Sequence, residues 1–269
     1  MLGFGVPAAK ATEAADERNV RRFMERQLYT ECMRTRREVI ALGAIPFAGS
    51  KQLRGGGLRL NVIRNGRSNR RYLHIHGDES TARDVLTAHM KENAGVAFLV
   101  DNDQRNFVQG GLQFDPNRIW SHVGALANID RLNPRISWAE RLFLIERLDR
   151  DREKLLRSIL PPAGGLLIAL HNNARGYSVQ DEIPISDKTS LADAANTHEF
   201  FLCTNEGDYQ VLSKSPFNIV LQNRMPPTDD GSFSRLAAKL GVRYVNLEVG
   251  LGKRDRQVEM LNWAAKNLA

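Results

Sequence analysis

The alternation of apolar and polar residues along the chain predicts a series of short strands. Residues 58–63, Leu-Arg-Leu-Asn-Val-Ile, alternate as a half-exposed strand does, because successive side chains of a strand point to opposite faces. Residues 95–101 and 165–170 are almost continuously apolar, which is typical of buried strands. The expected strands are residues 58–63, 71–75, 95–101, 165–170, 199–203, 218–222 and 242–249.

Helices are predicted where apolar residues recur at three- and four-residue spacings. Residues 80–91 place Ala82, Val85, Leu86 and Met90 on one helical face. Strand, loop, helix and strand therefore follow one another within about forty residues as a βαβ unit, which predicts an α/β fold. We expect a mixed, mostly parallel, twisted sheet flanked by helices. The expected helices are residues 11–43, 80–91, 138–160, 233–240 and 254–268.

Turn and loop signals divide the chain further. Asn65-Gly66 is its strongest short hairpin signal and predicts that residues 71–75 return beside residues 58–63. Residues 172–197 are too long for a simple connector, so they are predicted to be a functional loop. We expect residues 1–50 to form an N-terminal helical arm that is separate from the rest of the chain.

Composition narrows the function only a little. The chain has 38 Lys and Arg residues against 31 Asp and Glu, a net charge of +7. This excess suits an anionic ligand, although a solvated basic surface is the simpler explanation. Cys32 and Cys203 form no CxxC motif, so any metal ion would need histidine and carboxylate ligands.

Two further patterns bear on location. No apolar stretch approaches roughly 18–20 residues, which argues against a membrane span. The first residues lack the pattern of a signal peptide, so we expect a cytoplasmic protein, although a leader removed from the chain would leave the same start.

Two histidines come at the carboxyl ends of predicted strands, where α/β proteins bind their ligands. These are His76 and His171, and Glu79 follows His76 by three positions. Two histidines and one carboxylate can hold Zn²⁺ and leave a position for water. Local hydrogen bonding of each histidine is the alternative, and His74 is a rival ligand that lies inside its strand.

Four short motifs then occur in a fixed order. In this order they resemble the zinc carboxypeptidase superfamily, most of all its succinylglutamate desuccinylase and aspartoacylase branch, over about residues 58–265. Two positions depart from that branch: Pro116 stands where it has leucine, and Ala169 stands where it has an aspartate that supports the site. The motifs are His76-Gly77-Asp78-Glu79, Asp115-Pro116-Asn117-Arg118, Leu170-His171-Asn172-Asn173 and Leu247-Glu248.

The resemblance implies a zinc-carboxypeptidase-like hydrolase domain over residues 51–269, with one Zn²⁺ per chain. Metal-activated water would cleave an amide bond next to a carboxylate, in an N-acyl amino acid or a short peptide. The implied metal ligands are His76, Glu79 and His171; the implied catalytic residues are Glu248 as general base and Arg105 as oxyanion partner; the implied ligands of the substrate carboxylate are Asn117 and Arg118.

Other interpretations stay open at this point. A metallocarboxypeptidase that acts on cell-wall-type peptides fits the same motifs, and a non-catalytic basic binding module fits the charge. Aromatic residues make up only 7% of the chain and do not interleave with the arginines of residues 64–71, which argues against nucleic acid as a partner.

Some supporting roles can also be predicted for polar residues near these motifs. Asp78 and Asp101 are candidates for orienting a ligand histidine, and a capping role fits them equally well. Tyr177, Tyr209 and Tyr244 are candidates for contact with the substrate, and nothing in the sequence ranks them.

Overall fold

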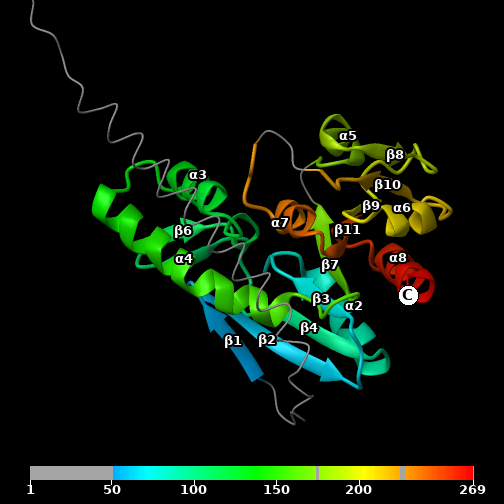
Figure 1. Cartoon of the computed structure of the whole chain (residues 1–269), viewed down its shortest axis with the longest axis horizontal. Coiled ribbons are helices and arrows are strands. Elements are labelled where there is room, and N and C mark those ends of the chain that lie inside the picture. The colour runs from blue at the N-terminus through cyan, green and yellow to red at the C-terminus, as the bar shows by residue number, and fades with distance from the viewer. Residues whose placement is uncertain (1–50, 174–175, 225–227, 269) are drawn as a thin grey trace, which may run out of the picture. The chain divides into compact units, whose positions relative to one another are not determined.

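A computed structural model of the protein describes residues 51–173, 176–224 and 228–268 (Figure 1). The predicted helical arm of residues 1–50 lies outside the described residues. The strands are β1 (Lys51–Gly55), β2 (Leu58–Asn65), β3 (Arg71–His74), β4 (Gly95–Val100), β5 (Phe107–Gln109), β6 (Leu112–Phe114), β7 (Leu166–Asn173), β8 (Lys188–Ser190), β9 (Phe200–Cys203), β10 (Asn218–Leu221) and β11 (Arg243–Gly250). The helices are α2 (Ser80–Glu92), α3 (His122–Leu132), α4 (Trp138–Ile159), α5 (Val179–Glu182), α6 (Glu206–Leu212), α7 (Phe233–Leu240) and α8 (Arg254–Asn267), with 3₁₀ turns η2 (Pro116–Arg118) and η3 (Ile183–Ile185).

Nine strands form one mixed sheet in the order β1-β2-β4-β3-β7-β11-β9-β10-β8, and β5 and β6 form a separate hairpin. The centre of the large sheet is parallel, because β4, β3, β7 and β11 run side by side in one direction. Antiparallel pairings lie outside this centre, at β1–β2, β2–β4, β11–β9 and β10–β8. The predicted α/β fold with a mixed sheet is confirmed.

Two apolar layers sandwich the sheet. Helices α3, α4 and α7 pack on one face, and α2, α6 and α8 pack on the other. The strands feed both layers by alternation: in β7, Leu167 and Ala169 point to the first face, while Leu166, Ile168 and Leu170 point to the second. Because both faces of this strand are covered, residues 165–170 carry no polar side chain. Figure 1 shows α4 lying along β1 and β2 at one end of the first layer.

The predicted hairpin between residues 58–63 and 71–75 is wrong. The strand β2 pairs with β1 and with β4, whereas β3 pairs with β4 and β7, so β4 lies between β2 and β3. Gly66 does adopt the left-handed conformation of a turn, with φ 56°. A turn signal fixes only the local direction of the chain, while the parallel pairing of β3 with β4, joined through α2, decides which strand is the neighbour.

The loop of residues 172–197 carries more structure than its sequence suggests. It contains α5, η3 and β8, and β8 adds an edge strand beside β10. Elements that the sequence pattern did not predict are β1, the hairpin β5–β6, α3 and α6. Among the helices of the described ranges, none combines the length and apolar character that a bilayer crossing requires.

Candidate metal centre and active site

The candidate site lies at the carboxyl ends of three neighbouring parallel strands. His76 comes two residues after β3, His171 lies near the end of β7, and Glu248 lies near the end of β11. The register of β7 and β11 pairs Glu248 directly with His171. Alternation places His171 and Glu248 on the same face as Ala169 and Tyr244, below α7. Neighbouring strand ends thus bring together residues that are far apart in the sequence.

The three predicted metal ligands lie together, with both histidines directed at the carboxylate of Glu79. Its Oε1 lies 2.7 Å from Nδ1 of His76, and its Oε2 lies 3.0 Å from Nδ1 of His171. All three side chains are buried, and one ligand atom from each lies within 4.8 Å of the others. His74 is not part of this cluster, because it lies on the other face of β3 and binds the backbone carbonyl of Glu79 through Nε2 at 3.0 Å.

This cluster has the chemistry that a divalent cation needs. The two imidazoles each present Nδ1 toward the same carboxylate, and ligand atoms bound to one tetrahedral Zn²⁺ at about 2.0–2.1 Å lie about 3.3 Å apart. Glu79 Oε2 is buried and has no hydrogen-bond partner among the described residues, although Nδ1 of His171 lies 3.0 Å away. A bound cation would satisfy this oxygen. The residues present therefore fit a metal ion held by two nitrogens and a carboxylate.

Asp115 orients His76, a role that the sequence analysis did not assign. Its Oδ1 lies 2.9 Å from Nε2 of His76, so the imidazole is held between two carboxylates and its Nδ1 is turned to Glu79. Burial lowers the pKa of His76, but Glu79 and Asp115 outweigh it and raise the pKa to about 9. Since a metal-bound histidine nitrogen must be unprotonated, a metal ion bound here would have to displace a proton from Nδ1.

We expect Asp115→Asn to weaken zinc binding by about 10–100-fold, the usual cost of losing an outer partner of a ligand histidine. The carboxylate that fixes the orientation of His76 is lost, while the size of the side chain is kept. Competition with a chromophoric chelator measures the affinity. Asp101→Asn is the matched control, because its carboxylate contacts Gln52 and Asn61 and not the histidines. An Asp115→Asn protein with wild-type zinc affinity would contradict this role.

The expectation that Asp101 or Asp78 orients a histidine is therefore not met. Asp78 is exposed to solvent, and Asp101 binds residues of β1 and β2. The usable signal for Asp115 was its place directly after an apolar strand end and two positions before Asn117. Sequence spacing alone could not select it, since 39 positions separate it from His76.

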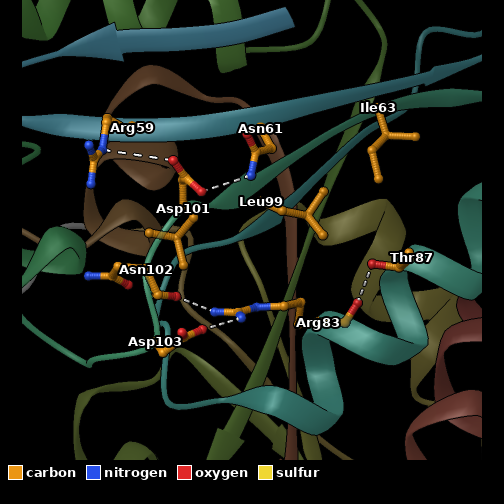
Figure 2. Close-up of a pocket in the computed structure, with 10 residues that line it drawn as sticks. Arg59, Asn61, Ile63, Arg83, Thr87, Leu99, Asp101, Asn102 and Asp103 are labelled. Atoms are coloured by element: carbon orange, nitrogen blue, oxygen red, sulfur yellow. Dashed lines mark hydrogen bonds and ion pairs between the residues drawn. The ribbon is translucent and has the colours of Figure 1, made fainter. Parts of the chain in front are cut away.

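Gly77 and Arg83 hold the loop that carries His76 and Glu79. The Gly77 amide donates to the carbonyl of Gln104 at 3.0 Å, and a Cβ on Gly77 would lie 2.2 Å from Oδ1 of Asn102, so only glycine fits there. Arg83, on α2, donates to the Gly77 carbonyl at 2.9 Å. It also donates to the Asn102 carbonyl and, at 2.7 Å, to Asp103 Oδ1 (Figure 2). Together these contacts fix the loop against the segment that follows β4.

A polar hollow of about 430 Å³ opens beside Arg83 (Figure 2). Residues of β2, α2 and the segment after β4 line it, including Arg59 and Asp101, which form an ion pair across it at 3.8 Å. None of the predicted metal ligands, catalytic residues or substrate ligands lines this hollow. It lies beside the ligand loop and is separate from the cluster of metal ligands.

Glu248 is buried beside the cluster of metal ligands, and one oxygen of its carboxylate accepts a hydrogen bond. Asn246 donates from Nδ2 to Glu248 Oε1 at 3.0 Å, and burial raises the pKa of the Glu248 carboxyl above its ordinary value. Burial and then the charge of Glu248 raise the pKa of the Tyr244 phenol, and the same two causes raise the pKa of the phenol of Tyr177. Its hydroxyl donates to Glu182 at 2.5 Å. A buried carboxylate with a raised pKa is suited to taking up and releasing a proton.

The three predicted polar partners occupy different places. Arg105 reaches the ligand cluster, with Nη1 3.2 Å from Glu79 Oε1. Asn117 accepts a hydrogen bond from the Phe233 amide at 3.1 Å, so it joins η2 to the start of α7. Arg118 pairs with Asp230 and also contributes to lowering the pKa of Asp115. Of the three, Arg105 contacts the cluster, whereas Asn117 and Arg118 lie in η2, directly after Asp115.

Comparisons with known proteins give loose structural likeness only. No family model matches the chain, and no curated protein matches it. A candidate metallopeptidase from Shewanella amazonensis SB2B shares 14% identity over 91% of both chains, with a TM-score of 0.36. A second, from Shewanella baltica OS155, shares 13% identity over 91% of this chain and 90% of that one, with a TM-score of 0.39.

A third structure is the succinylglutamate desuccinylase/aspartoacylase from Rhodobacter sphaeroides. It shares 11% identity with this chain, over 83% of this chain and 68% of that one, and the TM-score is 0.39. These neighbours are named for the same kinds of hydrolase that the sequence motifs resemble.

Proposed function

We propose that the protein is a zinc-dependent hydrolase that cleaves an amide bond next to a carboxylate in an N-acyl amino acid or a short peptide. The observation that carries the proposal is the convergence of His76, Glu79 and His171 on one buried point, with Glu248 in register beside it. A Zn²⁺ held by these three residues would polarise the amide carbonyl and lower the pKa of a water molecule to about 7.

The residues of the chain supply the remaining steps. Glu248 takes the proton of the attacking water and returns it to the leaving amine. Arg105, half-exposed and already directed at the cluster, pairs with the negative charge that develops on the carbonyl oxygen. Arg118 binds the substrate carboxylate through two parallel hydrogen bonds, with the Nδ2 group of Asn117 as a further donor.

The test is a screen of zinc-loaded protein against N-acetyl amino acids, N-succinyl amino acids and short peptides with a free carboxylate. We expect release of an amine from at least one class, dependent on added metal and abolished by a chelator. Turnover that persists unchanged after complete metal removal would contradict the proposal. Peptide turnover without acyl-amino-acid turnover would favour the metallocarboxypeptidase form of the same chemistry.

A further inference from the structure

Asp230 lies against Arg118, the residue to which the proposed function assigns the substrate carboxylate. The two side chains approach to 3.3 Å between Arg118 Nη1 and Asp230 Oδ2. Both stay accessible, with 35% of the Arg118 side chain and 46% of the Asp230 side chain exposed. The inference below rests on the proposed function, because it concerns what Arg118 and Asp230 bind together.

The loop before α7 is built so that Asp230 stays beside Arg118. The Trp120 amide donates to the Gly231 carbonyl at 3.0 Å, which joins the loop to the segment after η2. Gly231 has φ 75°, and a Cβ there would lie 2.4 Å from the Arg118 carbonyl, so the two backbones touch. Asp230 Oδ1 accepts from the Ser232 amide at 3.0 Å, which leaves Oδ2 for Arg118.

Arg118 keeps donors free while it pairs with Asp230. Its contacts with Asp230 and with the Asn117 carbonyl both use Nη1, and among the described residues no contact uses Nε or Nη2. Nε and Nη2 form the edge of the guanidinium that binds a carboxylate by two parallel bonds. A substrate carboxylate can therefore bind Arg118 without displacing Asp230.

The charge around such a bound carboxylate then limits the substrate. Asp230 already balances the positive charge of Arg118. A second carboxylate on the substrate therefore finds no net positive charge at this pair and is repelled by the charge of Asp230. A substrate with a positively charged group close to its carboxylate would satisfy Asp230 instead. The local charge of this subsite thus differs from the basic excess of the whole chain.

We propose that the amino-acid part of the substrate carries a second, unacylated amine, whose ammonium group binds Asp230 while its carboxylate binds Arg118. The substrate class is the Nα-acyl derivatives of basic amino acids and peptides that end in such a residue. Dicarboxylic amino acids such as acyl-glutamate are disfavoured by the same pair.

The test compares substrates that differ only in this charge. Zinc-loaded protein is assayed with Nα-acetyl-lysine, Nα-acetyl-norleucine and Nα-acetyl-glutamate in both enantiomeric forms. Dipeptides that end in lysine, norleucine or glutamate are assayed in the same way. We expect kcat/KM for the lysine compound to exceed that for norleucine by about three- to fivefold, the size that a half-exposed ion pair supplies. The preference should shrink as salt is added, because exposed charges are screened.

Variants of the loop separate charge from structure. Asp230→Asn can still accept the Ser232 amide, and we expect it to remove the preference for lysine and to raise kcat/KM for glutamate. Asp229→Asn is the matched control: it removes the same charge from the same loop, but its carboxylate accepts from the Gly231 amide and does not contact Arg118. A lysine preference that is absent in the wild type, or that survives in Asp230→Asn, overturns the proposal.

Binding distinguishes failure of this inference from failure of the proposed function. The zinc-loaded Glu248→Gln protein, with and without Asp230→Asn, is titrated calorimetrically with Nα-acetyl-lysine, Nα-acetyl-norleucine and Nα-acetyl-glutamate in both enantiomeric forms. Lysine binding that depends on Asp230, without turnover of any compound by the wild type, would uphold the subsite and reject the hydrolase. Turnover of all three compounds without an Asp230-dependent preference would uphold the hydrolase and reject the subsite.

Discussion

Glu248→Gln is expected to lower kcat by about 10²–10⁴-fold while the protein keeps its full zinc content, because positioned proton transfer usually contributes that much. Glutamine has the size of glutamate and can still accept the hydrogen bond that Asn246 donates to Glu248 Oε1. It cannot take a proton from water. The change therefore removes the base and leaves the packing of β11 beside β7 intact.

Three measurements on this variant decide the role. They are kcat on the substrate found in the screen, zinc content by elemental analysis, and the thermal unfolding midpoint. Glu146→Gln is the control, since Glu146 is exposed on α4 and should show wild-type kcat. A Glu248→Gln protein that holds zinc and retains kcat within about tenfold of wild type would rule out Glu248 as the general base.

His171→Ala is expected to reduce zinc affinity by more than about 100-fold, because loss of even an outer partner of a ligand costs 10–100-fold. The variant removes the Nδ1 atom that lies 3.0 Å from Glu79 Oε2 and leaves only His76 and Glu79 to hold a cation. Zinc content after dialysis against metal-free buffer should fall from about one ion per chain to nearly none. Activity should fall with it.

Thermal stability gives a second readout for the same variant. A ligand that binds only the folded state stabilises it, by about 2.7 kcal/mol when the ligand is at 100 times its dissociation constant. Added zinc should therefore raise the unfolding midpoint of the wild type and of the control His122→Ala, whose histidine pairs with Asp149 on the surface of the described structure. The midpoint of His171→Ala should stay unchanged. An equal rise in both variants would show that the metal binds elsewhere.

Hydrophobic patterning predicted the elements that build the site. The alternation and the apolar runs located β7 and β11, and the period of two in a strand placed His171 and Glu248 on the layer of Ala169 and Tyr244. Within β3 the same period places His74 on the face of Tyr72, opposite the layer of Ala169 and Tyr244. These features depend only on neighbours along the chain, so the sequence contains them.

Other features depend on contacts between distant segments. Asp115 meets His76 only because the hairpin β5–β6 and η2 fold back toward the ends of β3 and β7. Asp230 meets Arg118 only because a glycine lets the loop before α7 touch the backbone after η2. Neither pair has a spacing that a local pattern could reveal.

The sequence by itself determined the α/β class and most of the strands, because the strand period is a local property, and its motifs proposed His76, Glu79 and His171 as the metal ligands. It misplaced β3 beside β2, since a turn signal does not specify the neighbour in a sheet. Only the tertiary structure decided strand order, the partner that orients His76 and the charge that surrounds Arg118. Each of these features depends on packing between segments that are far apart in the sequence.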